Sequence, residues 1–185
     1  PPGFIAVHTH AGGIIHAPLA ANFGRMGVTP VIVGNCGTAF PDVAEFLATL
    51  ARAQPVINVA TLAGHNESRG AVMGTSFMRP PTPDELNRMK SLVARAMHDG
   101  ALGLSTGLIY IPGKYARTEE LIELARVAAT NGGIYASHIR DENEGMVSSP
   151  DDVLPMRSDD PAPALFIPQK LPRTPPHTQP PAHPP

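Results

Sequence analysis

A repeated order of short apolar segment, polar or glycine-rich turn and amphipathic segment constrains the fold of this chain most strongly. The apolar segments are rich in β-branched and other apolar residues and are bounded by Gly, Pro or Asn, which is typical of buried strands. Strands alternating with helices favour a parallel sheet with helices packed outside it, so we expect an α/β fold. The predicted strands cover residues 4–10, 29–36, 56–63, 101–106 and 133–138.

The segments between these strands carry helix signals. Pro41 can open a helix with an apolar stripe along one face. Thr82 and Glu85 match a capping box, which predicts a second helix. Thr118 is expected to cap a third helix, and a weaker helix is expected over 17–26.

Two architectures could hold this alternation of strands and helices. An open doubly wound sheet normally carries a phosphate-binding Gly-rich turn after its first strand, and the segment HTHAGGIIHA has only an adjacent glycine pair. The sequence therefore favours a partial (β/α)8 barrel of about five βα units over the open sheet.

Composition changes abruptly near residue 148. Twelve of the 22 prolines lie at or after Pro150, and no glycine follows Gly145. The last segment has no sustained period of two or 3.6, and dense proline favours solvated, extended backbone. We therefore expect a folded domain over 1–147 and a disordered proline-rich tail over 148–185.

Overall composition excludes several classes of function. The net charge is −2, which gives no basic field for binding nucleic acid, and no apolar run is long enough to cross a bilayer. The single cysteine excludes an internal disulfide framework. The chain begins Pro-Pro-Gly rather than with Met, so we expect that its natural start is missing.

Side chains that can bind metal lie at the carboxyl ends of the predicted strands. His8 and His10 end the first strand on the same face, Cys36 ends the second, His65 follows the third and His138 ends the fifth. In parallel α/β folds this edge is the active face. Imidazole nitrogen and thiolate sulfur are ligands that zinc prefers, so the pattern predicts a transition-metal site.

Each of these residues also has a simpler interpretation. Cys36 could be a small core residue, or a nucleophile with a histidine as its base. His65 is expected to be a hydrogen-bonded histidine at a strand end, and His138 could pair with a nearby carboxylate. His16 and His98 are interpreted as structural or surface residues.

Four sequence blocks together resemble the N-acyl-D-amino-acid deacylases, or D-aminoacylases, of the metal-dependent amidohydrolase superfamily. The blocks are PGFIAVHTH, GVTPVIVGNCG, NVATLAGHN and GALGLSTGLIYIPGKYARTEELIELARVAA, the last followed by GGIYASHIRDE. The resemblance covers residues 1 to about 145. VGNCG, the LSTGL segment and ASHIRDE are specific in combination, whereas His-x-His marks only the superfamily.

The resemblance implies a (β/α)8 barrel that holds Zn²⁺ at the carboxyl ends of its strands. The matching motifs imply that His8, His10, Cys36 and His138 bind the metal and that Tyr110 holds the substrate carboxylate. The implied reaction is hydrolysis of the N-acyl amide of a small-molecule N-acyl-D-amino acid, in a cytoplasmic protein. The family's catalytic aspartate comes from a late strand, so we expect it to lie beyond this chain, which contains no catalytic residue of that kind.

Two alternatives remain open at the level of sequence. The chain could be a non-catalytic, truncated half-barrel that pairs with another chain to complete its sheet. It could also belong to a cyclic-amide hydrolase related to dihydroorotase or hydantoinase, although the cysteine after the second strand argues against this reading. The preferred amino acid, the acyl group, the number of metal ions and the oligomeric state are not predicted.

Overall fold

The computed structural model describes residues 3–17, 19–140 and 164–166, and it shows parallel strands alternating with helices. The prediction of an α/β fold is confirmed at this level. The strands are β1 (Phe4–Ala6), β2 (Val28–Val33), β3 (Asn58–Thr61), β4 (Ala63–Gly64), β5 (Gly103–Gly107), β6 (Ile134–His138) and β7 (Ala164–Phe166).

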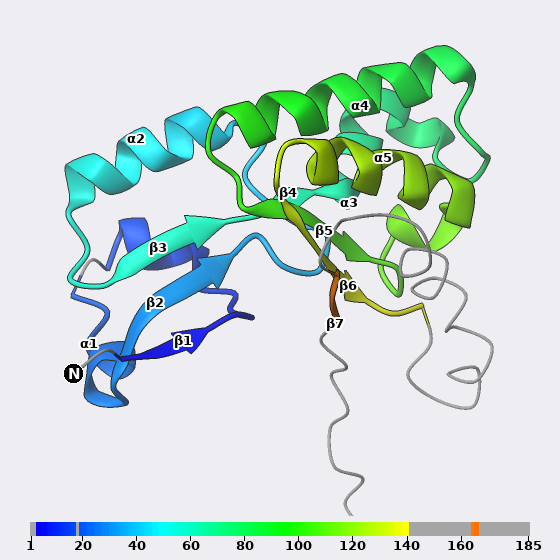
Figure 1. Cartoon of the computed structure of the whole chain (residues 1–185). Helices are drawn as coiled ribbons and strands as arrows, with labels where there is room; N and C mark the ends of the chain where they lie inside the picture. The colour runs from blue at the N-terminus through cyan, green and yellow to red at the C-terminus, as the bar shows by residue number, and fades with distance from the viewer. Residues whose placement is uncertain (1–2, 18, 141–163, 167–185) are drawn as a thin grey trace, which may run out of the picture.

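Five α-helices and three short 3₁₀ helices connect the strands within the described residues (Figure 1). The α-helices are α1 (Ala21–Arg25), α2 (Val43–Ala53), α3 (His65–Met73), α4 (Pro83–His98) and α5 (Thr118–Thr130). The 3₁₀ helices are η1 (Gly12–Ile15), η2 (Gly74–Ser76) and η3 (Gly113–Tyr115). No helix of the described residues is long and apolar enough to cross a membrane.

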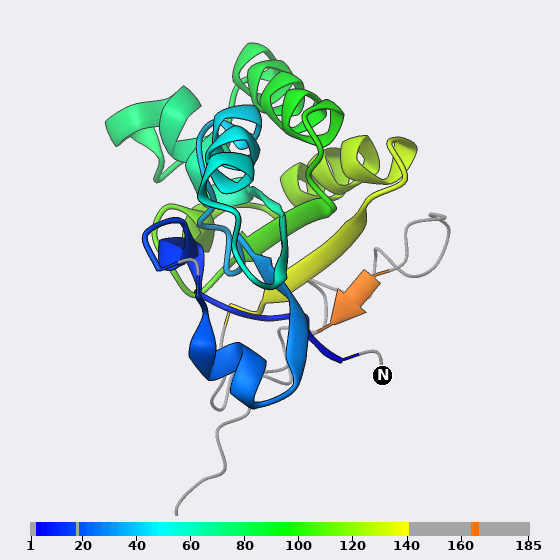
Figure 2. The same ribbon diagram turned by 90° about the vertical axis from the view of Figure 1, so that its left-hand side faces the viewer.

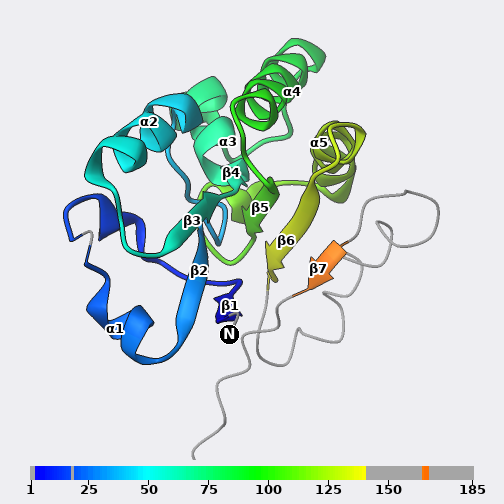
Figure 3. The same cartoon turned by 60° about the vertical axis from the view of Figure 1, so that its left-hand side comes forward.

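All strand pairs are parallel, and they form two sheets of order β1-β2-β3 and β4-β5-β6-β7. Only Leu62 separates β3 from β4, and its backbone N–H donates to the carbonyl of Val33 at 3.0 Å. The last strand of the first sheet therefore leads directly into the first strand of the second sheet. Figure 3 shows the resulting curved run of strands with α2, α3, α4 and α5 on its outer side.

The helices bury their apolar faces against these strands. The larger core cluster lies between β5, β6, α4 and α5 and includes Leu104, Met89 and Leu121, each fully buried. A second cluster covers β2 with residues of α2, such as Phe46 and Leu50. In Figures 1 and 2, α2, α4 and α5 lie above the strands, and α1 lies below them. The helix layer thus leaves the strand ends free to carry the polar residues.

Helix starts agree with the sequence prediction in one case and differ in two. At α4 the Thr82 side chain accepts from the Glu85 N–H while the Glu85 carboxylate accepts from the Thr82 N–H, which confirms the capping box. Helix α2 begins at Val43, two residues after Pro41, and the Asp42 side chain caps it by accepting from the Glu45 N–H. Thr118 is the first residue of α5 and makes no side-chain cap, so its predicted capping role is wrong.

Three elements differ from the prediction, two in their boundaries and one because it was not predicted. The first strand ends at Ala6, so His8 and His10 follow the strand instead of belonging to it. Helix α3 was not predicted, because its buried residues include His65, Asn66, Ser68 and Arg69 and it lacks an apolar stripe. The weak helix expected over 17–26 is limited to α1.

The predicted disordered tail lies almost wholly outside the described residues. Within it only β7 is described, and its residues pair with Tyr135, Ala136 and Ser137 of β6. The expectation of a disordered tail over 148–185 stays a prediction. An exposed strand edge carries unpaired N–H and C=O groups, and the apolar Ala-Leu-Phe segment satisfies those of β6.

Candidate metal centre

His8 and His10 are positioned by the residue between them. The backbone N–H of Thr9 and its hydroxyl both donate to the carbonyl of Ile32, at 3.1 and 2.8 Å. The Asn35 side-chain amide donates to the Thr9 carbonyl at 3.2 Å and to the Ile32 carbonyl at 2.9 Å. Thr9 is therefore fixed against β2, and the two histidines flank it in the segment that follows β1, not within a strand as predicted.

Cys36 lies in the loop after β2, in an unusual backbone conformation. Its φ is +57°, in the left-handed region that non-glycine residues rarely occupy, and its neighbours Gly34 and Gly37 have φ of +77° and +74°. These three left-handed residues turn the chain sharply after β2. The turn places the buried Cys36 side chain beside the His-Thr-His segment.

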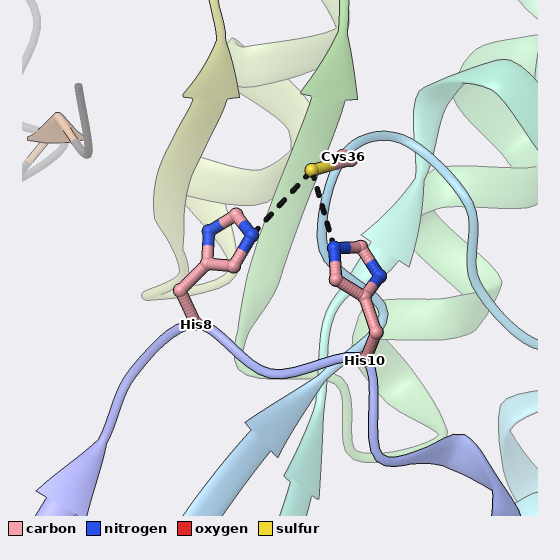
Figure 4. Close-up of side chains that lie close together, drawn as sticks. All are labelled: His8, His10 and Cys36. Atoms are coloured by element: carbon pink, nitrogen blue, oxygen red, sulfur yellow. Dashed lines mark hydrogen bonds between the residues drawn. The ribbon is translucent and has the colours of Figure 1, made fainter. Parts of the chain in front are cut away.

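The thiol of Cys36 is the point on which three imidazoles converge. Its Sγ lies 3.5 Å from Nε2 of His8 and 3.7 Å from Nε2 of His10, as drawn in Figure 4. Nδ1 of His138, at the end of β6, lies 3.3 Å from the same sulfur. The ligand atoms of His8, His10 and Cys36 all lie within 4.8 Å of one another. Four residues thus meet at the carboxyl ends of the strands, although Cys36 and His138 alone are 102 positions apart in the sequence.

The electrostatics of this cluster suit a cation. Burial lowers the pKa of His8, and the neighbouring His10 and His138 lower it further. A lowered pKa favours the neutral imidazole, which is the form that binds metal. One thiolate and three imidazoles are a donor set of the kind that zinc and copper accept, so the residues present fit a divalent transition metal.

Tyr110, the predicted substrate-binding residue, lies next to the cluster without joining it. Its ring packs edge-on against the His138 ring, with centroids 5.1 Å apart, and 48% of the residue is exposed. A tyrosine that is half exposed beside the cluster can reach a molecule bound there. Its role in substrate binding stays a prediction.

His65 does not join the cluster. It begins α3, is fully buried, and its Nε2 donates to the Glu120 carboxylate at 2.8 Å, so the hydrogen-bonded role predicted for it is confirmed. Arg69 also donates to Glu120. Burial alone raises the pKa of Glu120, but the hydrogen bonds and charges of His65 and Arg69 outweigh it and lower the pKa. His98 is exposed and faces Asp99, as expected for a surface residue.

Three polar residues that support the cluster were not predicted as such. Asn35 ties the β2 loop to Thr9, Ser105 bonds both sides of the Cys36 loop, and Asn66 donates through its side chain to the Gly107 carbonyl at 3.2 Å. In the sequence Asn35 stands beside Gly34, whereas Ser105 and Asn66 have no adjacent glycine, and none of the three carries a signal for these contacts. Their partners are backbone groups distant in the chain, which the sequence does not identify.

Comparison with known proteins gives a consistent result. No family model matches the chain. D-aminoacylase of Alcaligenes xylosoxydans xylosoxydans is 35% identical over 173 residues, which is 80% of this chain and 35% of that protein. The crystal structure of D-aminoacylase, described as defining a novel subset of amidohydrolases, matches with a TM-score of 0.82 at 33% identity.

A second solved structure extends the comparison. N-acyl-D-glutamate deacylase from Bordetella bronchiseptica, in complex with zinc and a phosphonate inhibitor that mimics the tetrahedral intermediate, matches with a TM-score of 0.83 at 34% identity. That match covers 88% of this chain and 39% of the solved one. A D-aminoacylase variant has also been solved with copper chloride.

The chain is homologous to the D-aminoacylase family. The sequence resemblance is thereby confirmed, and it extends over most of the chain's own length. The chain spans little more than a third of the curated relative's length and 40% of the D-aminoacylase crystal structure.

Proposed function

We propose that this chain is part of a zinc-dependent amidohydrolase that hydrolyses the N-acyl amide bond of N-acyl-D-amino acids. The observation that carries the proposal is the approach of three imidazole nitrogens to within 3.7 Å of one thiol, in a chain homologous to D-aminoacylases. Zinc is proposed because the solved deacylase relative carries it and because a thiolate with imidazoles suits it.

The chain's own residues divide into those that would bind the metal and one that would bind the substrate. His8, His10, Cys36 and His138 would hold the metal. When bound, zinc would polarise the acyl carbonyl and lower the pKa of the attacking water. Tyr110, against His138 and half exposed, would orient the substrate by donating its hydroxyl to the carboxylate.

The described strands would form the first part of a (β/α)8 barrel. Parallel strands alternating with helices, and the likeness to D-aminoacylase structures, support this arrangement. In it the metal site lies at the carboxyl ends of the strands, where such barrels carry their active sites. The chain spans about two fifths of the solved relatives, and the proton-transferring aspartate would come from a strand outside the described residues.

Two other functions are less well supported. A cyclic-amide hydrolase would be expected to show relatives of that kind, whereas the relatives found are D-aminoacylase and deacylases for N-acyl-D-glutamate and N-acyl-D-aspartate. A non-catalytic half-barrel remains the second candidate because the chain spans only about two fifths of the solved relatives. The cytoplasmic location stays a prediction.

A chimera tests the proposed activity. Residues 3–140 replace the matching segment of the Alcaligenes D-aminoacylase, and the purified protein is loaded with zinc. Hydrolysis of N-acetyl-D-amino acids and of their L enantiomers is followed by amine release. The same chimera carrying Cys36→Ala is the control.

The proposal predicts hydrolysis of the D enantiomer that the control lacks. A chimera that folds, binds zinc and hydrolyses neither enantiomer would contradict the proposed reaction. A chimera as active with Cys36→Ala as without it would contradict the proposed role of the thiol.

A further inference from the structure

Ser105 bridges the two sides of the loop that carries Cys36. Its hydroxyl donates to the Gly34 carbonyl at 2.5 Å and accepts from the Gly37 N–H at 3.1 Å. Ser105 is fully buried in β5. Its two partners, Gly34 and Gly37, are the residues directly before Asn35 and directly after Cys36. One side chain therefore closes this turn from both ends.

The Gly37 N–H belongs to the peptide that directly follows Cys36. A hydrogen bond to this N–H fixes the plane of that peptide, and with it the rotation about the Cys36 Cα–C bond. The Cys36 φ of +57° is sparsely populated for cysteine, so the surrounding contacts have to maintain it. Together these two angles set the direction of the Cys36 Cα–Cβ bond, from which the thiol extends.

Ser105 is itself held rigidly. In β5 it pairs with Gly64 of β4 on one side and with Ala136 of β6 on the other. In the same register, Gly107 of β5 pairs with His138. Because side chains two residues apart share a face of a strand, Ser105 and Ala136 lie on the same face as His138. The strand that fixes the cysteine loop is thus also the neighbour of the fourth candidate ligand.

We propose that Ser105 is a positioning residue for the metal site, which sets the orientation of the Cys36 thiol by bonding Gly34 and Gly37. The proposal rests on the metal site proposed above. Ser105 acts through the loop backbone, because its hydroxyl bonds the Gly34 carbonyl and the Gly37 N–H. Hydrogen-bonding partners that orient a ligand change metal affinity by about 10- to 100-fold when they are removed.

A matched control lies beside it on the same strand. Thr106 is also fully buried, and its hydroxyl also has two partners, the Tyr135 hydroxyl and the Ser137 hydroxyl, each at 2.9 Å. It points to the opposite face of β5 from Ser105. Thr106→Val therefore removes a buried hydroxyl and two hydrogen bonds without touching the Cys36 loop.

The test uses Co²⁺ alone as the probe, on the 185-residue chain and on Ser105→Ala and Thr106→Val. Cys36 is the only cysteine, so the thiolate-to-cobalt charge-transfer absorption reports on this one thiol. We expect Ser105→Ala to weaken Co²⁺ binding by about 10- to 100-fold and to reduce the charge-transfer intensity at saturation. Thr106→Val is expected to keep the parent's Co²⁺ affinity and charge-transfer intensity. Its loss of stability in urea unfolding should be similar to that of Ser105→Ala.

A second readout needs no metal. The alkylation rate of Cys36 by iodoacetamide under native conditions measures how well the loop holds the thiol, which is 6% exposed. We expect faster alkylation in Ser105→Ala and an unchanged rate in Thr106→Val. If the parent chain gives no charge-transfer absorption, the metal site itself is wrong, and the alkylation rates then decide the positioning role on their own.

Two results would overturn the proposal. The first is a folded Ser105→Ala protein with the parent's Co²⁺ affinity, absorption and alkylation rate. The second result comes from Ser105→Thr, which keeps the hydroxyl and replaces Ser105→Ala if that variant does not fold. Retained absorption in Ser105→Thr supports the positioning role, and a folded Ser105→Thr protein without the absorption rejects it.

Discussion

Replacing Arg69 with methionine tests the buried ion pair that joins α3 to α5. Arg69 is fully buried and donates to the Glu120 carboxylate, to the Phe77 carbonyl at 2.9 Å and to the Arg79 carbonyl at 2.7 Å. Arg69→Met leaves the Glu120 charge buried with His65 as its only described partner. Removing one member of a buried pair costs about 3–5 kcal/mol, which is a large part of the 5–15 kcal/mol typical of a domain.

The loss of stability depends on pH in a definite direction. The pKa of Glu120 is lowered in the folded chain, so its contribution to stability is complete above the ordinary carboxyl pKa of 4.5 and is lost as the pH falls through the folded value. Without Arg69 the pKa of Glu120 is lowered less. The difference in unfolding free energy between parent and variant should therefore be largest at pH 7 and smaller at pH 4.

Urea unfolding followed by circular dichroism at both pH values measures this difference. Arg52→Met is the matched control, because the Arg52 side chain is 65% exposed and pairs with Glu45 at the surface. An exposed pair contributes about 0–1 kcal/mol, so the control should change little. A loss below about 1 kcal/mol in Arg69→Met, or a loss that is the same at both pH values, would refute the reasoning.

Three further predictions concern the helix cap, the core and the strand beside Cys36. Thr82→Ala removes the capping box of α4 and should cost about 1 kcal/mol in urea unfolding, and an unchanged midpoint would contradict the cap. Met89→Ala should cost about 2–5 kcal/mol because Met89 is fully buried, whereas Met78→Ala, at a residue 66% exposed, should not; equal losses would argue against the core assignment. Gly107→Ala should abolish the Co²⁺–thiolate absorption, because a Cβ at Gly107 collides with the Cys36 carbonyl, and retained absorption would show that this contact is not needed.

Periodicity and turn residues were sufficient to predict most of the fold. The strands at β2, β5 and β6 and the helix α4 follow from apolar runs bounded by Gly, Pro and a capping box. Helix α3 was missed because its buried face is made of polar residues that bond to Glu120 and Gly107 instead of packing against apolar neighbours. Such a helix is recognisable only when its distant partners are known.

The candidate metal site could be predicted in its residue types but not in its geometry. His8, His10, Cys36 and His138 were predicted because each ends a predicted strand, at the carboxyl ends of the predicted sheet. The left-handed φ of Cys36 and the hydrogen bonds of Ser105 could not be predicted, because they depend on a loop and a strand 68 or more residues apart. Glycines on both sides of Cys36 indicated a tight turn without indicating which residue closes it.

The zinc content of the purified 185-residue chain, measured by mass spectrometry beside a Cys36→Ala variant, tests the central claim most directly. The Sγ contacts with His8, His10 and His138 predict near-stoichiometric zinc in the parent and its loss in the variant. Absence of zinc from both proteins, or equal zinc in both, would contradict the claim that these four residues form a metal site.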